Sequence, residues 1–408
     1  MCNRMNHEHD VVGQERKEKS TITFMQQLFP FLYPISCGIM FLGNSMLPMQ
    51  FLFSNNLLHP TTGDPYQFNI VCALCYGFVF AMIGLNVLFD TTIILTQKIL
   101  EWLALYPQLR LVMTSRRRWH RYRAPIMFLL SAKIVLGGAL IAREDPIVVN
   151  VTIPIANLPR SLDNNFRIIQ ISDVHIGVTI GRTRVKRVVD IVNDLCSGSG
   201  EECDLIAITG DIIDGEPRGL KKAIEPLGEL CPHKKVPKLF VPGNHEHIHF
   251  IVDHVVDVLS EMGIDHLINS NIRLPRDAPT ENQLTVVGLD DLSSRRNRGK
   301  EQEAFDGIKS ESDTVILLAH QPNHLRVAEE ANNGVDLMLS GHTHAGQFFP
   351  GTIGAWMFNS RFSGYYPSSS RGKKTAVYVS AGTLFWGPPI RFSTRHHEIT
   401  DIRLVKSQ

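Results

Sequence analysis

Residues 166–175 read FRIIQISDVH. The first six residues form a short, isoleucine-rich run that is typical of a strand buried in a sheet. The chain then passes directly into Asp173 and His175, so a carboxylate and an imidazole follow the carboxyl end of the predicted strand. In α/β folds, chemistry gathers in the loops beyond strand ends. This stretch therefore predicts both a buried sheet and the place of a functional site.

The same arrangement occurs four more times between residues 205 and 344. Each time, a short apolar run ends in a loop that carries Asp, Asn or His. If these runs are strands of one fold, five sets of polar side chains could meet at one edge. The four further runs are residues 205–208 before Gly210-Asp211, 238–241 before Gly243-Asn244-His245-Glu246, 315–319 before His320, and 337–339 before Gly341-His342-Thr343-His344.

Helical periodicity fills intervals between the predicted strands. Valines recur at positions i, i+3, i+4 and i+7 over residues 185–192, and apolar residues repeat this spacing over residues 252–259. Gly263 then follows as a stop signal. Two more strands are predicted at residues 285–289 and 377–379. Because strands alternate with helices, we predict an α/β domain with its sheet inside.

The polar residues at the strand ends form a set of metal ligands. A single Asp or His in such a place is more often a cap or a hydrogen-bonded residue than a ligand. Five ends together supply carboxylate, amide and imidazole donors without a thiolate, which suits Mn, Fe or Zn better than a structural zinc site. A shared carboxylate would hold two ions about 3.5–4 Å apart. Gly210, Gly243 and Gly341 fit tight turns near an ion, although ordinary turn glycines would look the same.

The five blocks, in the order D-x-H, G-D, G-N-H-E, isolated H and G-H-T-H, resemble the calcineurin-like metallophosphoesterase superfamily. The resemblance covers residues 147–402. Two runs, GHTHAGQ at 341–347 and YVSAGTLFWGPPIRF at 378–392, are more similar to its membrane-associated branch, which includes bacterial phosphoesterases and animal transmembrane proteins with a metallophosphoesterase domain. The resemblance implies a four-layer αββα sandwich, in which two mixed sheets are flanked by helices.

The resemblance also implies a role for each residue that matches the motif. Seven residues would hold two divalent ions, and His245 would stabilise or protonate the leaving oxygen. His247 and His249 are expected near the start of a helix or behind the ligands, and His396 and His397 at the surface. One ion would be held by Asp173, His175, Asp211 and His344, and the other by Asp211, Asn244, His320 and His342, with Asp211 as the bridge.

The first part of the chain has a different composition. Nearly all long apolar runs precede residue 143, and three are long enough to cross a bilayer, which needs about 20 helical residues. They are residues 28–53, 68–89 and 124–142. A cleaved signal peptide fits the first run poorly, because about twenty mixed-charge residues precede it. We therefore predict an N-terminal multi-pass membrane region over residues 1–142 and a catalytic domain over residues 143–408.

Lys and Arg near the apolar runs predict the orientation. Residues 54–67 contain neither, whereas the segment after the second run carries seven basic residues and is expected in the cytoplasm. The catalytic domain is then extracytoplasmic or lumenal, on the same side as the glycosylation sequon at Asn150. Residues 91–113 are interpreted as an amphipathic helix in the membrane interface, and the domain would be cytoplasmic if they spanned instead. The basic residues are Lys98, Arg110, Arg116, Arg117, Arg118, Arg121 and Arg123.

The predicted activity is hydrolysis of phosphate esters by a metal-bridging hydroxide. A phosphodiesterase or pyrophosphohydrolase acting on a lipid head group is an alternative, because the bilayer is near. A phosphoprotein phosphatase is less favoured on the extracytoplasmic side, and a non-enzymatic membrane scaffold is disfavoured by the intact ligand set. The expected partners are a phosphate-ester substrate, lipid-linked or soluble, and the membrane. The net charge of +1 argues against nucleic acid, and the sequence indicates no protein partner.

Three further features remain open from the sequence. Cys196 and Cys203 could form a disulfide in an oxidising compartment, but Cys231 makes the number of soluble-domain cysteines odd, so the pairing is undecided. Lys133, in the third apolar run, could pair with Asp90 or extend to the interface. Residues 346–374 are long, aromatic and glycine-rich; they are interpreted as a substrate lip, a membrane-contacting surface or an elaborated β-hairpin.

Overall fold

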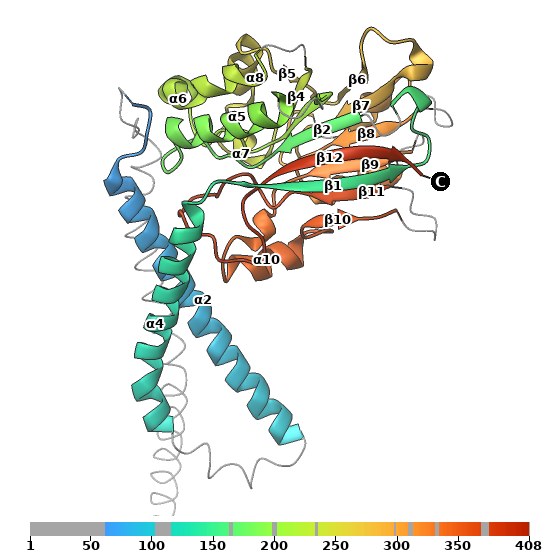
Figure 1. Ribbon diagram of the computed structural model, residues 1–408. Helices are drawn as coiled ribbons and strands as arrows, with labels where there is room; N and C mark the ends of the chain where they lie inside the picture. Colours follow the sequence, from blue (N-terminus) through green and yellow to red (C-terminus); the bar gives the residue numbers. More distant parts are fainter. Residues whose placement is uncertain are drawn as a thin grey trace, which may run out of the picture. The chain divides into compact units, whose positions relative to one another are not determined.

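The computed structural model describes residues 62–102, 116–162, 166–197, 202–232, 236–297, 299–308, 313–330, 334–368 and 375–407 (Figure 1). The chain divides into two compact units. One contains Val79–Ser131, and the other contains Leu52–Phe78 together with Ala132–Gln408. The second unit holds the α/β domain and also the adjoining parts of two long helices.

The α/β domain contains two six-stranded mixed sheets. In the first sheet, β12 pairs antiparallel with β2 while the other neighbours are parallel. In the second sheet, only the two outermost pairs are antiparallel. The order of the first is β1 (Ile147–Ile155), β12 (Glu398–Lys406), β2 (Phe166–Ile171), β3 (Leu205–Thr209), β4 (Lys238–Val241), β5 (Asp265–His266); that of the second is β10 (Gly364–Tyr366), β11 (Ala376–Val379), β9 (Leu337–Ser340), β8 (Val315–Leu318), β7 (Leu284–Gly288), β6 (Ser270–Leu274).

The two sheets face each other across a shared apolar core, to which Ile168 and Leu239 of the first sheet and Val286 and Leu339 of the second contribute. Helices cover the outer face of each sheet, so the domain has four layers, as the resemblance implied. The first sheet is covered by α5 (Arg182–Ser197), α6 (Pro217–Ile224) and α8 (Val252–Glu261), and the second by α9 (Leu325–Glu330) and the short 3-10 helix η4 (Glu301–Phe305).

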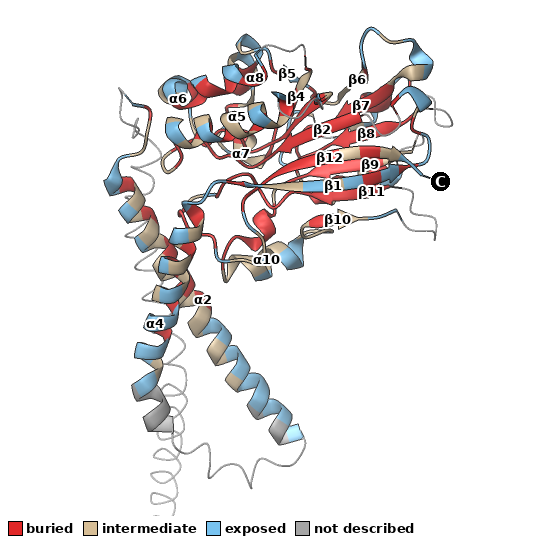
Figure 2. Ribbon diagram, viewed as in Figure 1, coloured by how far each residue is buried: buried red, intermediate tan, exposed pale blue. Residues whose placement is uncertain are grey.

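Covered faces explain why the central strands are apolar throughout. Every residue of β2 and of β3 is buried, since each strand has helices on one side and the second sheet on the other (Figure 2). All seven predicted strands are present, with ends that differ by one residue at most. The predicted valine face belongs to α5, and Val185, Val188, Val189 and Val192 are buried.

The terminal strands of the domain were not predicted individually. β1 and β12 run parallel over nine residue pairs, from Ile147 opposite Glu398 to Ile155 opposite Lys406. Their sequences, IVVNVTIPI and EITDIRLVK, include polar residues that no simple apolar run would contain. One of these, Asp401, forms a buried ion pair with Arg167 of β2 at 2.6 Å, and this pair satisfies both charges inside the sheet.

Two long helices belong to the N-terminal part of the chain. They are α2 (Gln67–Trp102) and α4 (Arg116–Ala142). Both include a candidate membrane span, Gln67–Thr96 and Tyr122–Ala142, and only 22% of the most apolar window of each is buried by protein. Such exposed apolar surface needs a covering of lipid or protein. The first predicted span, residues 28–53, lies outside the described residues, so multi-pass attachment stays a prediction.

The proposed separate helix at residues 91–113 is not observed over its described part. Helix α2 continues unbroken through residues 91–102, because no proline or glycine interrupts this segment. Within the same unit, Arg123 donates to the carboxylate of Asp90 at 2.8 Å. The partner of Asp90 within this unit is therefore Arg123.

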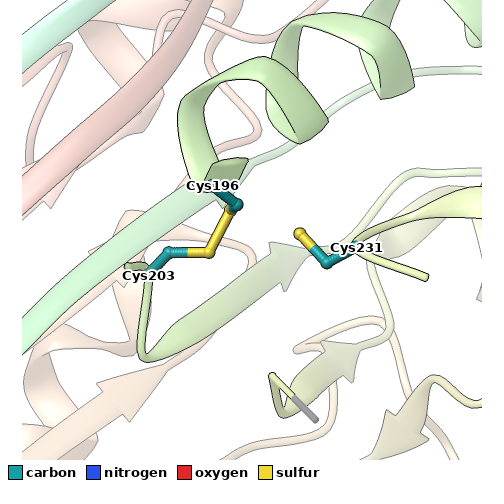
Figure 3. Close-up of side chains that lie close together, drawn as sticks. All are labelled: Cys196, Cys203 and Cys231. Atoms are coloured by element: carbon teal, nitrogen blue, oxygen red, sulfur yellow. A yellow bond between two sulfur atoms is a disulfide. The ribbon is translucent and has the colours of Figure 1, made fainter. Parts of the chain in front are cut away.

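A disulfide joins Cys196, at the end of α5, to Cys203, just before β3 (Figure 3). The bridge closes the short connection between the helix and the strand. Cys231 is buried beside this pair, and its sulfur lies within 4.8 Å of both other sulfurs. The structure thus favours the Cys196–Cys203 pairing, which the sequence left undecided.

Candidate metal centre

The five loops with polar residues meet at one end of the two facing sheets. Backbone hydrogen bonds between neighbouring loops hold these loops together. The amide of Asp173 donates to the carbonyl of Gly210 at 3.0 Å, and the amide of Gly341 donates to the carbonyl of His320 at 2.9 Å. All seven predicted ligands lie in this cluster, although Asp173 and His344 belong to the first and the last of the five loops.

One group of possible ligands contains Asp173, His175 and His344. The Nε2 atoms of His175 and His344 face each other at 2.9 Å, and the Nε2 atom of His344 lies 3.4 Å from the Asp173 carboxylate. Two imidazole lone pairs at this distance repel each other unless a proton or a cation lies between them. The arrangement therefore fits a metal ion bound by both rings.

A second group contains Asp211, His320 and His342. The Nε2 atom of His320 is 3.1 Å from the Asp211 carboxylate and 3.1 Å from the Asn244 side-chain oxygen. The same Asp211 carboxylate oxygen lies 3.8 Å from the Nε2 atom of His175, in the first group. Asp211 thus stands between the two groups, as a bridging carboxylate must.

The backbone at this cluster is strained. Positive φ angles, which are uncommon for residues with a Cβ, occur at five of the seven predicted ligands. Such strain persists only where the surrounding structure enforces it, and it gathers at functional sites. The five are Asp173 (56°), His175 (53°), Asp211 (51°), His342 (70°) and His344 (49°).

The glycines beside three of the predicted ligands are required, because the space around them has no room for a Cβ. A Cβ at Gly243 would come within 2.2 Å of the Asp211 carboxylate, and one at Gly341 within 2.2 Å of the Asp173 carboxylate. At Gly210, φ is +84°, and a Cβ would meet the His320 ring at 2.6 Å. At these three glycines the backbone therefore approaches the predicted ligands more closely than any other residue type allows.

Hydrogen bonds behind the ligands orient two of the imidazole rings. His320 Nδ1 is 2.8 Å from the Thr209 carbonyl, so this nitrogen carries the proton and Nε2 offers its lone pair to the cluster. His175 Nδ1 is 2.9 Å from the carboxylate of Asp214, with the same effect. Asp214 was not among the predicted residues, and the signal for it was only an Asp three positions after Asp211.

The pKa values of His342, His344 and Asp211 agree with metal binding. Burial lowers the pKa of His342 to about 4. Burial, together with neighbouring His175, likewise holds the pKa of His344 well below its usual value. Burial alone would raise the pKa of Asp211, but the surrounding histidines outweigh it and hold that pKa well below the ordinary range. Both imidazoles are thus neutral and the central carboxylate is ionised, which is the state that binds a cation. His320 differs, because burial alone would lower its pKa but the Asp211 and Asp173 carboxylates raise it well above the usual value, so a cation bound there must displace a proton.

His245 lies at the edge of the cluster. Its Nδ1 atom is 2.8 Å from the carboxylate of Asp214, and its ring meets that of His175 edge to face at 4.7 Å. Burial alone would lower the pKa of His245, but the carboxylates of Asp214 and Asp211 raise it to about 10. Asp214 therefore touches both a predicted ligand and the predicted catalytic histidine.

Glu246 joins the loop of Asp211 to the loop of Gly243. Sequence reasoning assigned it no role, although the residue belongs to the G-N-H-E block. Its carboxylate is fully buried and accepts four backbone N–H groups. The donors are Asp211 at 3.1 Å, Ile212 at 2.8 Å, Ile213 at 3.2 Å and Gly243 at 2.7 Å.

We expect Glu246→Ala to lower the free energy of unfolding by about 3–5 kcal/mol, because four buried donors lose their acceptor at once. Thermal unfolding of the purified chain should show a midpoint lower by roughly 10 °C. Glu216→Ala is the matched control, since the Glu216 carboxylate is 48% exposed. Equal midpoints for the two variants would contradict the anchoring role of Glu246.

Several predicted histidines can now be placed. His247, in helix α7 (Asn244–Ile248), bonds Asp290 at 2.6 Å and does not belong to either ligand group. His249 follows the helix and packs near His245 at a ring distance of 5.9 Å. His396 is exposed as expected, but the prediction for His397 was wrong: it is 1% exposed, because it immediately precedes the buried strand β12.

The segment after the last ligands contains a helix that was not predicted. Helix α10 (Gly351–Phe358) comes first, and β10 then pairs antiparallel with β11. The hairpin interpretation is thus correct only for the second half of the segment. Beside it, Trp386 stacks edge to face on His245 at 5.5 Å and is 50% exposed. No sequence signal had distinguished this tryptophan from its neighbours.

Comparison with known proteins shows which protein family this chain resembles. The family model for calcineurin-like phosphoesterases matches residues 166–346, the part that contains every residue of the cluster. A protein from Bos taurus called transmembrane protein with metallophosphoesterase domain is 32% identical over 84% of this chain and 74% of its own length. The chain belongs to the calcineurin-like phosphoesterases.

Other proteins are also similar to this calcineurin-like chain. The zebrafish transmembrane protein with metallophosphoesterase domain is 38% identical over 69% of this chain, which spans 62% of that relative's length. An uncharacterised metallophosphoesterase from Helicobacter pylori is 32% identical over 60% of the chain and 61% of its own length. A crystal structure of a dimetal phosphatase from Danio rerio aligns with 60% of this chain and 94% of that chain, at 16% identity and a TM-score of 0.34.

Proposed function

We propose that this chain hydrolyses phosphate esters with a dinuclear metal centre. Asp173, His175, Asp211 and His344 would hold one ion, and Asp211, Asn244, His320 and His342 the other. The single observation that carries the proposal is the position of the ionised Asp211 between two groups of imidazole nitrogens. Mn, Fe and Zn all suit this donor set, because it combines hard oxygen with borderline nitrogen ligands.

When bound, two such ions polarise phosphoryl oxygens and lower the pKa of a water between them, so that hydroxide is available near neutral pH. The protein contributes orientation. Thr209 and Asp214 fix the His320 and His175 rings, and His245 stands beside the cluster to meet charge that develops on the leaving oxygen. Asp214 holds the His245 ring in place for that task.

Turnover of chromogenic phosphate esters by the purified full chain tests this function. We expect hydrolysis of nitrophenyl monoesters or diesters that a chelator abolishes and that Mn²⁺ or Zn²⁺ restores. Comparing the two ester types also decides between monoesterase and diesterase action. A chain that binds the ions but turns over neither ester would support the alternative of a non-enzymatic scaffold.

The relatives named as transmembrane proteins and the two candidate spans indicate a membrane protein. We further propose a membrane region over residues 1–142 and a catalytic domain over residues 143–408 on the extracytoplasmic or lumenal side. The Cys196–Cys203 disulfide supports this side, since such bonds persist in oxidising compartments. Asn150 is exposed on the edge strand β1, so its sequon would be accessible to glycosylation on that side.

Sidedness can be measured in sealed vesicles from cells that express the chain. We expect a C-terminal tag to resist added protease until detergent opens the vesicles, and an endoglycosidase to shift the parent chain but not Asn150→Gln. The glycan requires lumenal exposure of the sequon. Cleavage of the tag in intact vesicles would place the catalytic domain in the cytoplasm and make phosphoproteins the more accessible substrates.

A lipid-linked phosphate diester or pyrophosphate is the second candidate substrate. The observation that favours it is the exposed tryptophan beside the proposed leaving-group residue, since Trp386 offers an apolar wall next to His245. An ester with a long apolar leaving group should then be hydrolysed with a lower KM than a water-soluble ester of the same phosphate type.

A further inference from the structure

Helix α10 has an apolar surface that the rest of the described domain does not cover. Its sequence, GTIGAWMF, contains no charged residue, and none of its side chains is buried (Figure 2). Trp356, Met357 and Phe358 are 71%, 61% and 76% exposed, and Ile353 is 43% exposed. A short helix of this composition would ordinarily be covered, so its exposure indicates a contact with membrane or protein.

This surface is fixed to the metal centre at both ends of the helix. The Thr352 hydroxyl near the start donates to the carbonyl of Gly346, two residues after the ligand His344. The Asn323 side chain, three residues after the ligand His320, donates to the carbonyl of Phe358 at 2.9 Å. The apolar helix is therefore held against two of the ligand loops, and its exposure does not come from a loose segment.

A second exposed apolar group adjoins the same loop. The Gln347 side chain bonds the backbone of Trp386 as both donor and acceptor at 2.9 Å, and the amide of Phe392 donates to the Gln347 carbonyl at 2.8 Å. Trp386 and Phe392 are 50% and 40% exposed. We call these two residues, with Ile353, Trp356, Met357 and Phe358, the α10 surface.

The loop that carries Trp386 and Phe392 also packs on both candidate membrane spans. The amide of Arg391 donates to the carbonyl of Gly138 in α4 at 2.8 Å. Ile390 lies so close to Gly77 of α2 and to Gly138 that an added Cβ would meet its side chain at 2.2 and 2.5 Å. Both glycines fall inside the candidate spans Gln67–Thr96 and Tyr122–Ala142.

A bilayer that covers these spans therefore approaches the loop that carries Trp386 and Phe392. The composition agrees with this environment, because tryptophan and phenylalanine are favoured at the membrane interface and helix α10 itself carries no charged residue. We propose that the α10 surface inserts into the lipid interface on the side of the catalytic domain. Insertion would hold the ligand loops of His320 and His344 at the membrane, facing phosphate groups of the lipid layer.

Quenching of tryptophan fluorescence tests this without any measurement of turnover. The full chain would be reconstituted in phosphatidylcholine nanodiscs with ordinary or brominated acyl chains, as the parent and as Trp356→Phe. The difference between their emissions reports Trp356 alone among the four tryptophans. We expect brominated lipid to reduce this difference emission by roughly twofold or more, as for an interfacial tryptophan.

Iodide in the water is the complementary quencher, and it should scarcely reduce the same difference emission in ordinary nanodiscs. Matching thermal midpoints of the parent and Trp356→Phe would show that the substitution leaves the fold intact. Difference emission that iodide quenches and brominated lipid leaves unchanged would overturn the proposal and leave the surface to a protein partner. Because neither measurement uses a substrate, this result is independent of the proposed esterase activity.

Discussion

Asp211→Asn should reduce turnover by roughly 10³-fold or more, because the bridging position then loses the charge that holds two cations at one carboxylate. Asparagine keeps the size of the side chain and can still accept the backbone N–H of His245, which is 2.8 Å from the Asp211 carboxylate. The variant should therefore bind less metal, measured by mass spectrometry of the purified protein, while its fold stays intact.

The control for this variant is Asp253→Asn. Asp253 lies on α8 with its side chain 81% exposed, so the same chemical change occurs far from any ligand group. It should leave both the metal content and the turnover unchanged. Full metal occupancy together with full activity in Asp211→Asn would refute the bridging assignment and with it the dinuclear centre.

His245→Gln should retain both ions and lose activity in a way that depends on the leaving group. For an alkyl ester, whose leaving oxygen needs a proton, we expect turnover to fall by about 10²–10⁴-fold. For a nitrophenyl ester the loss should be much smaller, since this leaving group departs as a stable anion. The comparison isolates the role of His245, because the phosphoryl group is the same in both substrates.

His254→Gln is the matched control, since His254 lies on α8 and is 51% exposed beside Glu216. It should behave like the parent with both esters. Equal losses for the alkyl and nitrophenyl esters in His245→Gln would mean that His245 binds the phosphoryl group and does not serve the leaving oxygen.

The sequence predicts the buried central strands well, because a strand that is buried on both faces is a continuous apolar run. β2 and β3 are apolar at nearly every position, and each ends at a ligand loop. β12 gives no such signal, since Asp401 and Glu398 are buried within it through partners distant in sequence, Arg167 and Tyr378. Such pairing cannot be recognised before the strands are placed side by side.

The predicted ligands were found because each follows a strand end, in three loops beside a glycine, but the residues that support them carry weaker signals. Asp214 and Glu246 act through contacts with other loops. Trp386 lies 141 positions from His245 in the chain. His396 and His397 were interpreted together as a surface pair, but only His396 is exposed. The roles of these residues depend on tertiary contacts, which no local sequence pattern indicates.

The number of ions that activity requires is the most direct measurement of the central claim. The metal-free chain, prepared by chelation and dialysis, would be titrated with Mn²⁺ while bound metal and ester hydrolysis are measured in the same samples. The proposed centre predicts that turnover rises to its maximum only as about two ions per chain become bound. Turnover that is complete with one ion, or that survives in the metal-free chain, would contradict it.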